Sequence, residues 1–325
     1  MLTMLIVITT FTHSFSQSTS ITISGRNAIS NEGVFPIFPD GISQNKRKTI
    51  TISNLEIPKT RPKDIITRHL GYSLLYDELH EQAKWVAYEL TSAETHKVAS
   101  RTNKFLPDPQ VKTNTANSSD YLASGYDRGH LAPAGDMSWS STAMAESFYY
   151  SNICPQVPAF NRGIWKRLEA LVRTWAIENN AVYVVAGPVL TNGLKTIGPD
   201  KVSVPKYFFK VILDYTGPDC NGIGFIMPNA RSEYPLQNYA VTIDSVEKIT
   251  GIDFFSSLPD FQEKLIEKSL CIPCWSWRST KTSNTKTVAF HKTSASDQCK
   301  GTTKAGNRCK KRTLTRSGYC YLHDK

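Results

Sequence analysis

The segment from Tyr126 to Asp136, which reads YDRGHLAPAGD, constrains this chain most. It places a histidine, an arginine and carboxylates among glycines and a proline, a composition that excludes a regular helix. Imidazole titrates near neutral pH, while guanidinium stays charged and offers a planar fork to phosphate oxygens. The segment therefore indicates His130 as a general base, with Arg128 beside a phosphate, and Asp127 as a structural residue that steadies Arg128 or the loop backbone.

A second segment, NRGIWKRLE from Asn161 to Glu169, follows about thirty residues later and predicts a metal site. A hard cation such as Mg²⁺ prefers oxygen ligands and often takes only one or two from the protein, so the Asn161 amide oxygen can suffice. Trp165, Glu169 and Arg173 follow at intervals of four and share one flank of a helix. We expect Glu169 to accept hydrogen bonds from metal-bound water and Arg173 to lie near the transferred phosphate.

Each of these residues also has a structural interpretation. Asn161 is a good N-cap for the helix that follows it. Glu169 and Arg173 have the spacing of a simple i,i+4 ion pair. A single histidine such as His130 is more often a hydrogen-bonded structural residue than a base. The combination of all four is much less expected by chance than any one of them.

The net charge of +10 is concentrated at one end of the chain. Residues 299–325 hold eight Lys and Arg against one Asp, so the other 298 residues carry only +3. The last 27 residues are therefore the part of the chain that attracts a polyanion such as a nucleic acid most strongly. The alternative interpretation of these residues is a solvated surface that keeps the protein soluble or docks a protein partner.

The same 27 residues contain a ligand set of three thiols and one imidazole: Cys299, Cys309, Cys320 and His323. This set suits a tetrahedral structural Zn²⁺. Disulfides and disorder are the alternatives for a segment with so little apolar content. The other four of the seven cysteines are Cys154, Cys220, Cys271 and Cys274, an even number that can pair as disulfides in an oxidising compartment.

The start of the chain predicts export. Residues 1–16 form a short apolar run that ends in small residues, as in a signal peptide, although a buried N-terminal strand is the alternative. Residues 17–48 have the composition of a flexible lead-in. No other run is long enough to span a bilayer, so we expect an exported protein, periplasmic or secreted.

Hydrophobic patterning predicts an α+β fold around a central antiparallel sheet, because strands and helices mix without a βαβ alternation. The expected strands cover 85–90, 181–186, 207–215 and 222–227, and an apolar stretch flanked by tyrosines at 72–76 precedes the first of them. The expected helices cover 162–177, 242–249 and 259–270, and the first of these has an apolar stripe at helical spacing. We assign residues 49–270 to one catalytic domain, 271–298 to a linker rich in Ser, Thr and Lys, and 299–325 to a small basic Cys₃His module.

Three ordered motifs resemble the DNA/RNA non-specific endonuclease family: DRGH at 127–130, SNICPQ at 151–156, and FNRG at 160–163 running on to LE at 168–169. The resemblance extends from about residue 57 to 270 and leaves the last 27 residues outside it. It implies a ββα-metal (His-Me) finger, in which the histidine segment faces the helix that begins near Asn161.

The resemblance also implies a role for each matching residue. His130 corresponds to the general base and Asn161 to the direct Mg²⁺ ligand, with Mn²⁺ as a substitute. Glu169 corresponds to the carboxylate that orients metal-bound water, Arg173 to a transition-state arginine, and Arg128 to the arginine beside the phosphate.

Two further positions complete the set: Arg101, an upstream arginine that contacts substrate, and Asn152, which we interpret as an organiser of the site. The expected protein is an exported Mg²⁺-dependent endonuclease that cuts DNA and RNA with little sequence specificity and leaves 5′-phosphates. The sequence leaves a homodimer open.

Overall fold

The computed structural model describes residues 52–216 and 220–278, together with short pieces at 297–298, 300–302, 306–308 and 312–313. Within these residues, no helix has the length and apolar character needed to cross a membrane.

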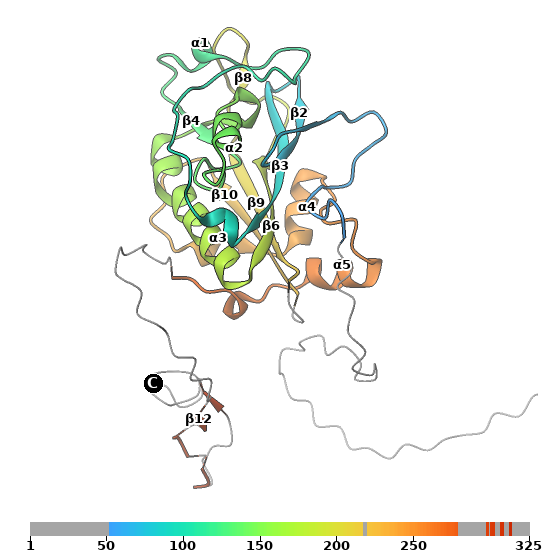
Figure 1. Ribbon diagram of the computed structural model, residues 1–325, viewed down its shortest axis with the longest axis vertical. Helices are drawn as coiled ribbons and strands as arrows, with labels where there is room; N and C mark the ends of the chain where they lie inside the picture. The colour runs from blue at the N-terminus through green and yellow to red at the C-terminus, as the bar shows by residue number, and fades with distance from the viewer. Residues whose placement is uncertain are drawn as a thin grey trace, which may run out of the picture. The chain divides into compact units, whose positions relative to one another are not determined.

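A seven-stranded sheet in the order β1-β2-β3-β6-β9-β10-β11 forms the centre, and every neighbouring pair is antiparallel (Figure 1). Its strands are β1 (Ile66–Arg68), β2 (Ser73–Asp77), β3 (Gln82–Thr91), β6 (Ala181–Pro188), β9 (Tyr207–Asp214), β10 (Asn221–Pro228) and β11 (Ala240–Val241). The central strands are buried on both faces: Val184 packs into one core cluster, whereas Val185 packs into another. This explains why they appear as nearly continuous apolar runs in the sequence.

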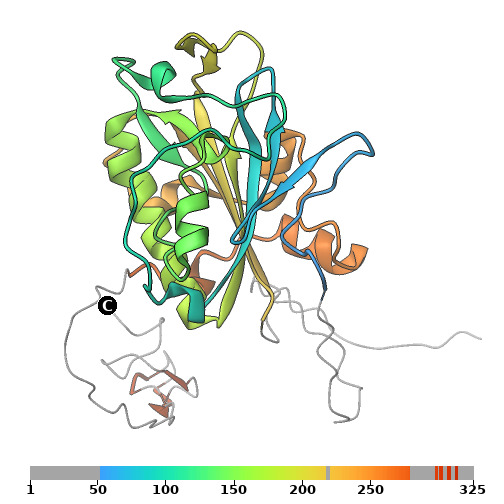
Figure 2. The same cartoon turned by 45° about the horizontal axis from the view of Figure 1, so that its top comes forward.

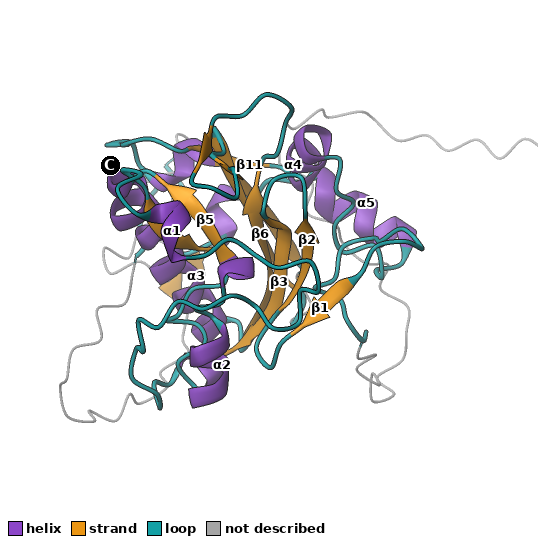
Figure 3. Cartoon of the chain, turned by 90° about the horizontal axis from the view of Figure 1, so that it is seen from above, coloured by secondary structure: helices purple, strands orange, loops and turns teal. Residues whose placement is uncertain are grey.

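The two faces of the sheet are covered by different elements (Figure 1 and Figure 2). One face carries the short pair β4 (Asp127–His130) and β5 (Ile153–Gln156), with α1 (Ser118–Tyr121), α2 (Ser141–Glu146) and α3 (Lys166–Glu178). The other face carries α4 (Ile243–Thr250) and α5 (Asp260–Lys268). Figure 3 shows the same layers from above, with α1, α2 and α3 on one side of the strands and α4 and α5 on the other.

The structure also describes several shorter elements. The 3₁₀ turns cover Ala93–Thr95, Tyr150–Asn152, Leu236–Tyr239 and Ile272–Cys274. Two further hairpins pair β7 (Thr196–Ile197) with β8 (Val202–Ser203) and β12 (Asp297–Gln298) with β13 (Arg312–Thr313).

The predicted α+β class with a central antiparallel sheet is confirmed. The long strands and α4 and α5 lie where the patterning places them, because their apolar periods are those of the buried faces. The helix expected from residue 162 differs at its start. A π-helical turn over Phe160–Trp165 precedes α3, because Gly163 leaves the helical region with φ −103° and ψ −108°.

Residues 271–277 pack on the core, although the sequence places them in a linker. Trp275 is buried, with its ring centroid 4.6 Å from that of Trp175, and Trp277 also contacts the Trp175 ring. The Trp175 indole nitrogen donates to the carbonyl of Ser276 at 2.6 Å. The packed body therefore extends to at least Trp277, because two tryptophans bury apolar area that a linker would leave in water.

The cysteines outside the basic module do not form the two disulfides that their number suggests. Cys271 and Cys274 are bonded. Cys154, however, is a buried free thiol on β5, so the second expected pair does not form.

We expect Trp275→Ala to lower the free energy of unfolding by about 3 kcal/mol, because it removes a buried indole from the core. Chemical denaturation of the full chain measures this change. Trp275→Phe is the matched control and should lower the free energy of unfolding by less. An aromatic ring remains in the core, and no hydrogen bond is lost, because the buried indole nitrogen has no partner among the described residues. Equal stability of Trp275→Ala and the wild-type protein would mean that this segment is a linker after all.

Candidate active site

Strand β4 holds His130 at the edge of the ββα unit. Gly129 pairs with Cys154 and His130 pairs with Ile153 on β5. A Cβ at position 129 would lie 2.2 Å from the Gln156 side chain, so the close approach of that side chain requires glycine here. The two strands thus carry His130 at the end of β4, where the chain turns.

The His130 imidazole is buried but retains one unpartnered nitrogen. Only 7% of the residue is exposed, and Nε2 has no hydrogen-bond partner among the residues that the structure describes. Buried polar atoms are normally paired, so an unsatisfied one needs an explanation. An Nε2 lone pair that is kept free is what a proton acceptor requires.

Two aromatic rings pack against the imidazole and support the neighbouring arginines. The Phe148 ring meets His130 edge-on with centroids 4.8 Å apart, and the Phe105 ring lies 5.7 Å away. The Arg101 guanidinium stacks over Phe148 and the Arg128 guanidinium over Phe105, each at 4.8 Å. The structure therefore brings Arg101 and Arg128 to the same site as His130 and holds both by cation–π contacts.

Burial, and to a smaller extent the positive charge of Arg101, lower the pKa of His130 from 6.5 to about 3. A hydrogen bond with the backbone of Arg128 partly opposes this shift. The imidazole is therefore neutral at pH 7 and able to accept a proton.

Asn152 fixes the turn that follows His130. Its side-chain oxygen accepts from the Ala132 N–H at 2.8 Å, and its nitrogen donates to the carbonyls of Ala132 at 2.9 Å and Ser147 at 2.8 Å. Asn152 is fully buried, and these bonds use both its donors and its acceptor. These bonds fix the position of the loop, and the organiser role of Asn152 stays a prediction.

Asn161 lies in the π-helical turn and is oriented by a carboxylate. Its amide nitrogen donates to Asp127 Oδ2 at 2.9 Å. Asp127 also accepts from Arg162 at 2.7 Å and 2.5 Å. The predicted contact of Asp127 with Arg128 or the loop backbone is therefore wrong: Asp127 reaches across to the helix. The N-cap alternative for Asn161 is also wrong, since its side chain bonds to Asp127 and the N-cap position falls on Ala159.

The orientation of the amide bears on metal binding. Because the nitrogen points to Asp127, the Asn161 oxygen is the atom left for another partner. A single amide oxygen with a carboxylate nearby fits a hard cation that keeps most of its waters. The residues present thus fit a divalent metal such as Mg²⁺ held by Asn161.

A second bond ties β4 to the same turn. The Trp165 indole nitrogen donates to the backbone carbonyl of His130 at 3.2 Å. Together with the Asp127–Asn161 bond, it attaches both ends of β4 to one turn of helix. These bonds connect the strand that carries His130 to the turn that carries Asn161, thirty-one positions away in the chain, and that the two residues form one site stays a proposal.

Glu169 and Arg173 belong to a charged cluster. Asp136 and Lys210, for which no role was predicted, belong to it as well. Arg173 donates to Asp136 Oδ1 at 2.6 Å, and the buried Asp136 also accepts from Tyr88 at 2.8 Å. The ion pair of Arg173 is thus with Asp136, so the simple Glu169–Arg173 pair is not what the structure contains. Burial raises the pKa of Glu169 to about 7, although the charge of Lys210 opposes that rise.

Sequence analysis missed Lys210, Phe105 and Phe148. Lys210 is fully buried, with Nζ 3.4 Å from the Leu131 carbonyl and 4.7 Å from the centre of the Trp165 ring. A lone lysine inside the apolar strand 207–215 was a signal that could have identified it, because lysine is rarely buried without a charged neighbour. The two phenylalanines carried no comparable signal, since their contacts with His130 are set by tertiary packing alone.

The proposed zinc ligands lie outside the described residues. These are Cys299, Cys309, Cys320 and His323. The zinc site therefore stays a prediction.

Comparison with known proteins agrees with this geometry. The DNA/RNA non-specific endonuclease family matches residues 54–261. Nuclease EXOG, mitochondrial, from Danio rerio is 40% identical over 207 residues, which cover 58% of this chain and 60% of that protein. Endonuclease G, mitochondrial, from Bos taurus is 35% identical over 203 residues, which cover 58% of this chain and 68% of that protein.

A solved structure is also similar: the crystal structure of an EndoG/EndoGI complex aligns with a TM-score of 0.60 and 32% identity. It covers 65% of this chain and 92% of that chain. The match to the EXOG relative spans only about 60% of that protein's length.

The prediction of export is wrong. The two relatives reported above, one from a fish and one from cattle, are both named as mitochondrial nucleases. A short apolar start without Lys or Arg is not specific enough to establish a signal peptide. Residues 1–16 themselves lie outside the described part of the chain.

The burial of neutral His130 predicts a pH dependence of stability. The unfolded chain takes up a proton on this side chain near pH 6.5, whereas the folded protein does so only near pH 3. Acid therefore favours the unfolded state progressively between these values. Between pH 7 and pH 5, we expect the wild-type protein to lose about 2 kcal/mol more of its free energy of unfolding than His130→Gln. Urea denaturation at both pH values tests this, and parallel losses in the two proteins would contradict it.

Proposed function

This chain belongs to the DNA/RNA non-specific endonuclease family, and on that premise we propose that it hydrolyses phosphodiester bonds of DNA and RNA with little sequence specificity. The observation that carries the proposal is the unpartnered Nε2 of His130, joined through β4 to an asparagine whose amide is fixed by Asp127. Arg101 and Arg128 beside the imidazole supply positive charge for phosphate oxygens.

His130 acts as the general base in this proposal. Its pKa of about 3 keeps the imidazole neutral in the free protein, and the unpartnered Nε2 can accept the proton of an attacking water. The rings of Phe105 and Phe148 hold the imidazole in one orientation, so aligning it with the phosphate costs little conformational entropy.

Asn161 would hold the metal ion, which we take to be Mg²⁺ with Mn²⁺ as a substitute. When bound, such an ion stabilises the leaving oxygen and supplies an acidic water for it. Glu169 follows two turns later on α3, where it can accept hydrogen bonds from waters around that ion. The high pKa of Glu169 falls when a cation is near, so metal binding favours the carboxylate form.

The three arginines have two different roles in this proposal. Arg128 and Arg101 are exposed and rest on aromatic rings, so their donors remain available to the substrate backbone. Arg173 is held by the buried Asp136, with 28% of its side chain exposed. It would contribute a fixed positive charge toward the transition state at little reorganisation cost.

We expect His130→Ala and Asn161→Ala each to lower the rate of plasmid cleavage by at least about 100-fold while the fold stays intact. Nicking of supercoiled plasmid in Mg²⁺ measures the rate, and circular dichroism reports on the fold. Cleavage by His130→Ala at close to the wild-type rate would exclude His130 as the base.

The same assay distinguishes two other classes of protein. A nucleic-acid-binding protein without catalysis would retain plasmid but never nick it. A narrow phosphodiesterase would cleave a small phosphodiester and leave plasmid and single-stranded RNA intact. Nicking that persists after chelation of divalent metal would contradict the role given to Asn161.

The orientation of Asn161 by Asp127 can be tested separately. Asp127→Ala leaves the Asn161 amide free to rotate, so we expect about a 10- to 100-fold loss of activity that higher Mg²⁺ concentrations partly restore. Asp64→Ala is the matched control, because Asp64 forms a similar exposed pair with Arg61 away from these motifs. Unchanged activity and unchanged Mg²⁺ dependence in Asp127→Ala would show that the amide needs no such support.

A further inference from the structure

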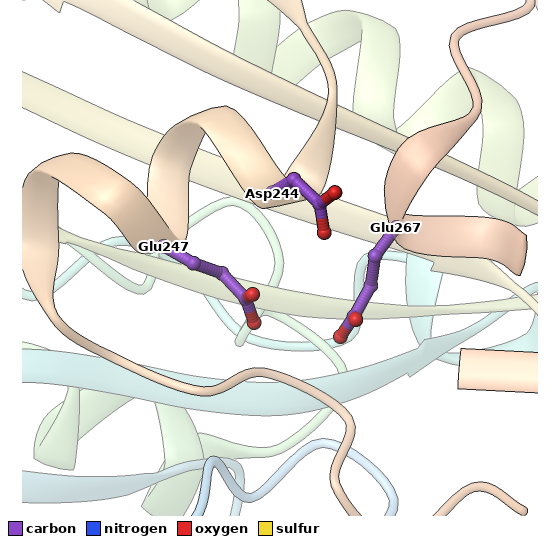
Figure 4. Close-up of side chains that lie close together, drawn as sticks. All are labelled: Asp244, Glu247 and Glu267. Atoms are coloured by element: carbon purple, nitrogen blue, oxygen red, sulfur yellow. The ribbon is translucent and has the colours of Figure 1, made fainter. Parts of the chain in front are cut away.

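A cluster of carboxylates lies on the face of the sheet opposite the candidate active site. Asp244 and Glu247 extend from α4 and Glu267 from α5, and Figure 4 shows their carboxylates directed toward the same space. One oxygen from each lies within 4.8 Å of the other two. Two oxygens that each sit about 2.4 Å from one Ca²⁺ are at most about 4.8 Å apart, so the set has the spacing of a cation site.

Two of these side chains have ordinary structural explanations. Asp244 is in the first turn of α4, where a negative charge interacts favourably with the helix dipole. Glu247 accepts from the Phe254 N–H at 2.8 Å and so fixes the chain that follows α4.

Glu267 has no such explanation. It is 7% exposed, and its Oε1 is buried without a hydrogen-bond partner in the described part of the chain. It is the penultimate residue of α5, where the helix dipole disfavours a negative charge. An unpartnered buried carboxylate directed at two others is costly unless something positive compensates for it.

Further carboxylates increase that cost. Asp253 and Glu263 form a second group with Glu267, again with ligand oxygens within 4.8 Å of one another. The positive charges that act on these groups include Lys59, which binds Asp253 at 3.0 Å, and Lys264. Of these five carboxylates, only Asp253 forms an ion pair within the described part of the chain, so Glu267 has no cationic partner there.

We propose that Asp244, Glu247 and Glu267 bind a hard divalent cation such as Ca²⁺, at a site separate from the one used for cleavage. Carboxylate oxygens are the ligands that Ca²⁺ and Mg²⁺ prefer, and water completes the coordination of a site with three protein ligands. The ion would join α4 to α5 and so stabilise the helical layer that covers this face of the sheet.

The test compares thermal unfolding of the metal-stripped full-length protein with and without added Ca²⁺ or Mg²⁺. At saturating ion we expect the unfolding midpoint of the wild-type protein to rise by roughly 5 °C more than that of Glu267→Gln. Ions that bind at Asn161 change the unfolding midpoint of both proteins equally, so their effect cancels in this comparison. Glu233→Gln removes an exposed carboxylate elsewhere and should respond as the wild-type protein does.

Further measurements separate loss of binding from loss of folding. Without metal, Glu267→Gln should melt at the same or a higher temperature than the wild-type protein, because it removes a buried repulsion. Asp244→Asn should also lose the metal response, and calorimetric titration should show one fewer Ca²⁺ bound in both variants. Plasmid cleavage by Glu267→Gln should stay at the wild-type rate. Equal responses of Glu267→Gln and the wild-type protein to both ions would overturn the proposal.

Discussion

The attachment of β4 to the turn before α3 is the constraint on which the rest of the candidate site depends. At one end of the strand Asp127 binds the Asn161 amide, and at the other the His130 carbonyl accepts from Trp165. A strand fixed at both ends cannot shift its register without breaking one of these bonds. The strand that carries the imidazole and the turn that carries the amide are therefore held relative to each other by these two bonds.

Burial and charge then give these groups their chemistry. The same desolvation that lowers the pKa of His130 raises that of Glu169, because each shift disfavours the charged form. The Asp136–Arg173 pair and Lys210 place compensating charges in the interior beside them. A buried ion pair contributes little net stability, but breaking it is costly. We infer that this cluster serves mainly to fix the start of α3 and the electrostatic field around it.

Each face of the sheet carries one local cluster of like charges, and the two clusters have opposite signs. The face with β4 and α3 presents Arg101 and Arg128, as expected for contact with a polyanion. The face with α4 and α5 gathers carboxylates around a buried Glu267 that no described group pairs. A polyanion is attracted to the pair of arginines, whereas a small divalent cation is attracted to the cluster of carboxylates.

The sequence by itself determined the elements and most of the chemistry. Apolar periods located the long strands and the helices α3, α4 and α5, and the motifs around His130 and Asn161 identified the residues that we propose to share a site. These features are local, since periodicity and turn composition are properties of neighbouring residues. Tertiary structure alone decided the partners: Asp127 with Asn161, Arg173 with Asp136, and the Phe105 and Phe148 rings around the imidazole. It also decided that Trp275 belongs to the core and that Lys210 is buried beside Glu169. Such contacts join positions tens of residues apart, and only the packing of the sheet and its two layers determines which distant side chains meet.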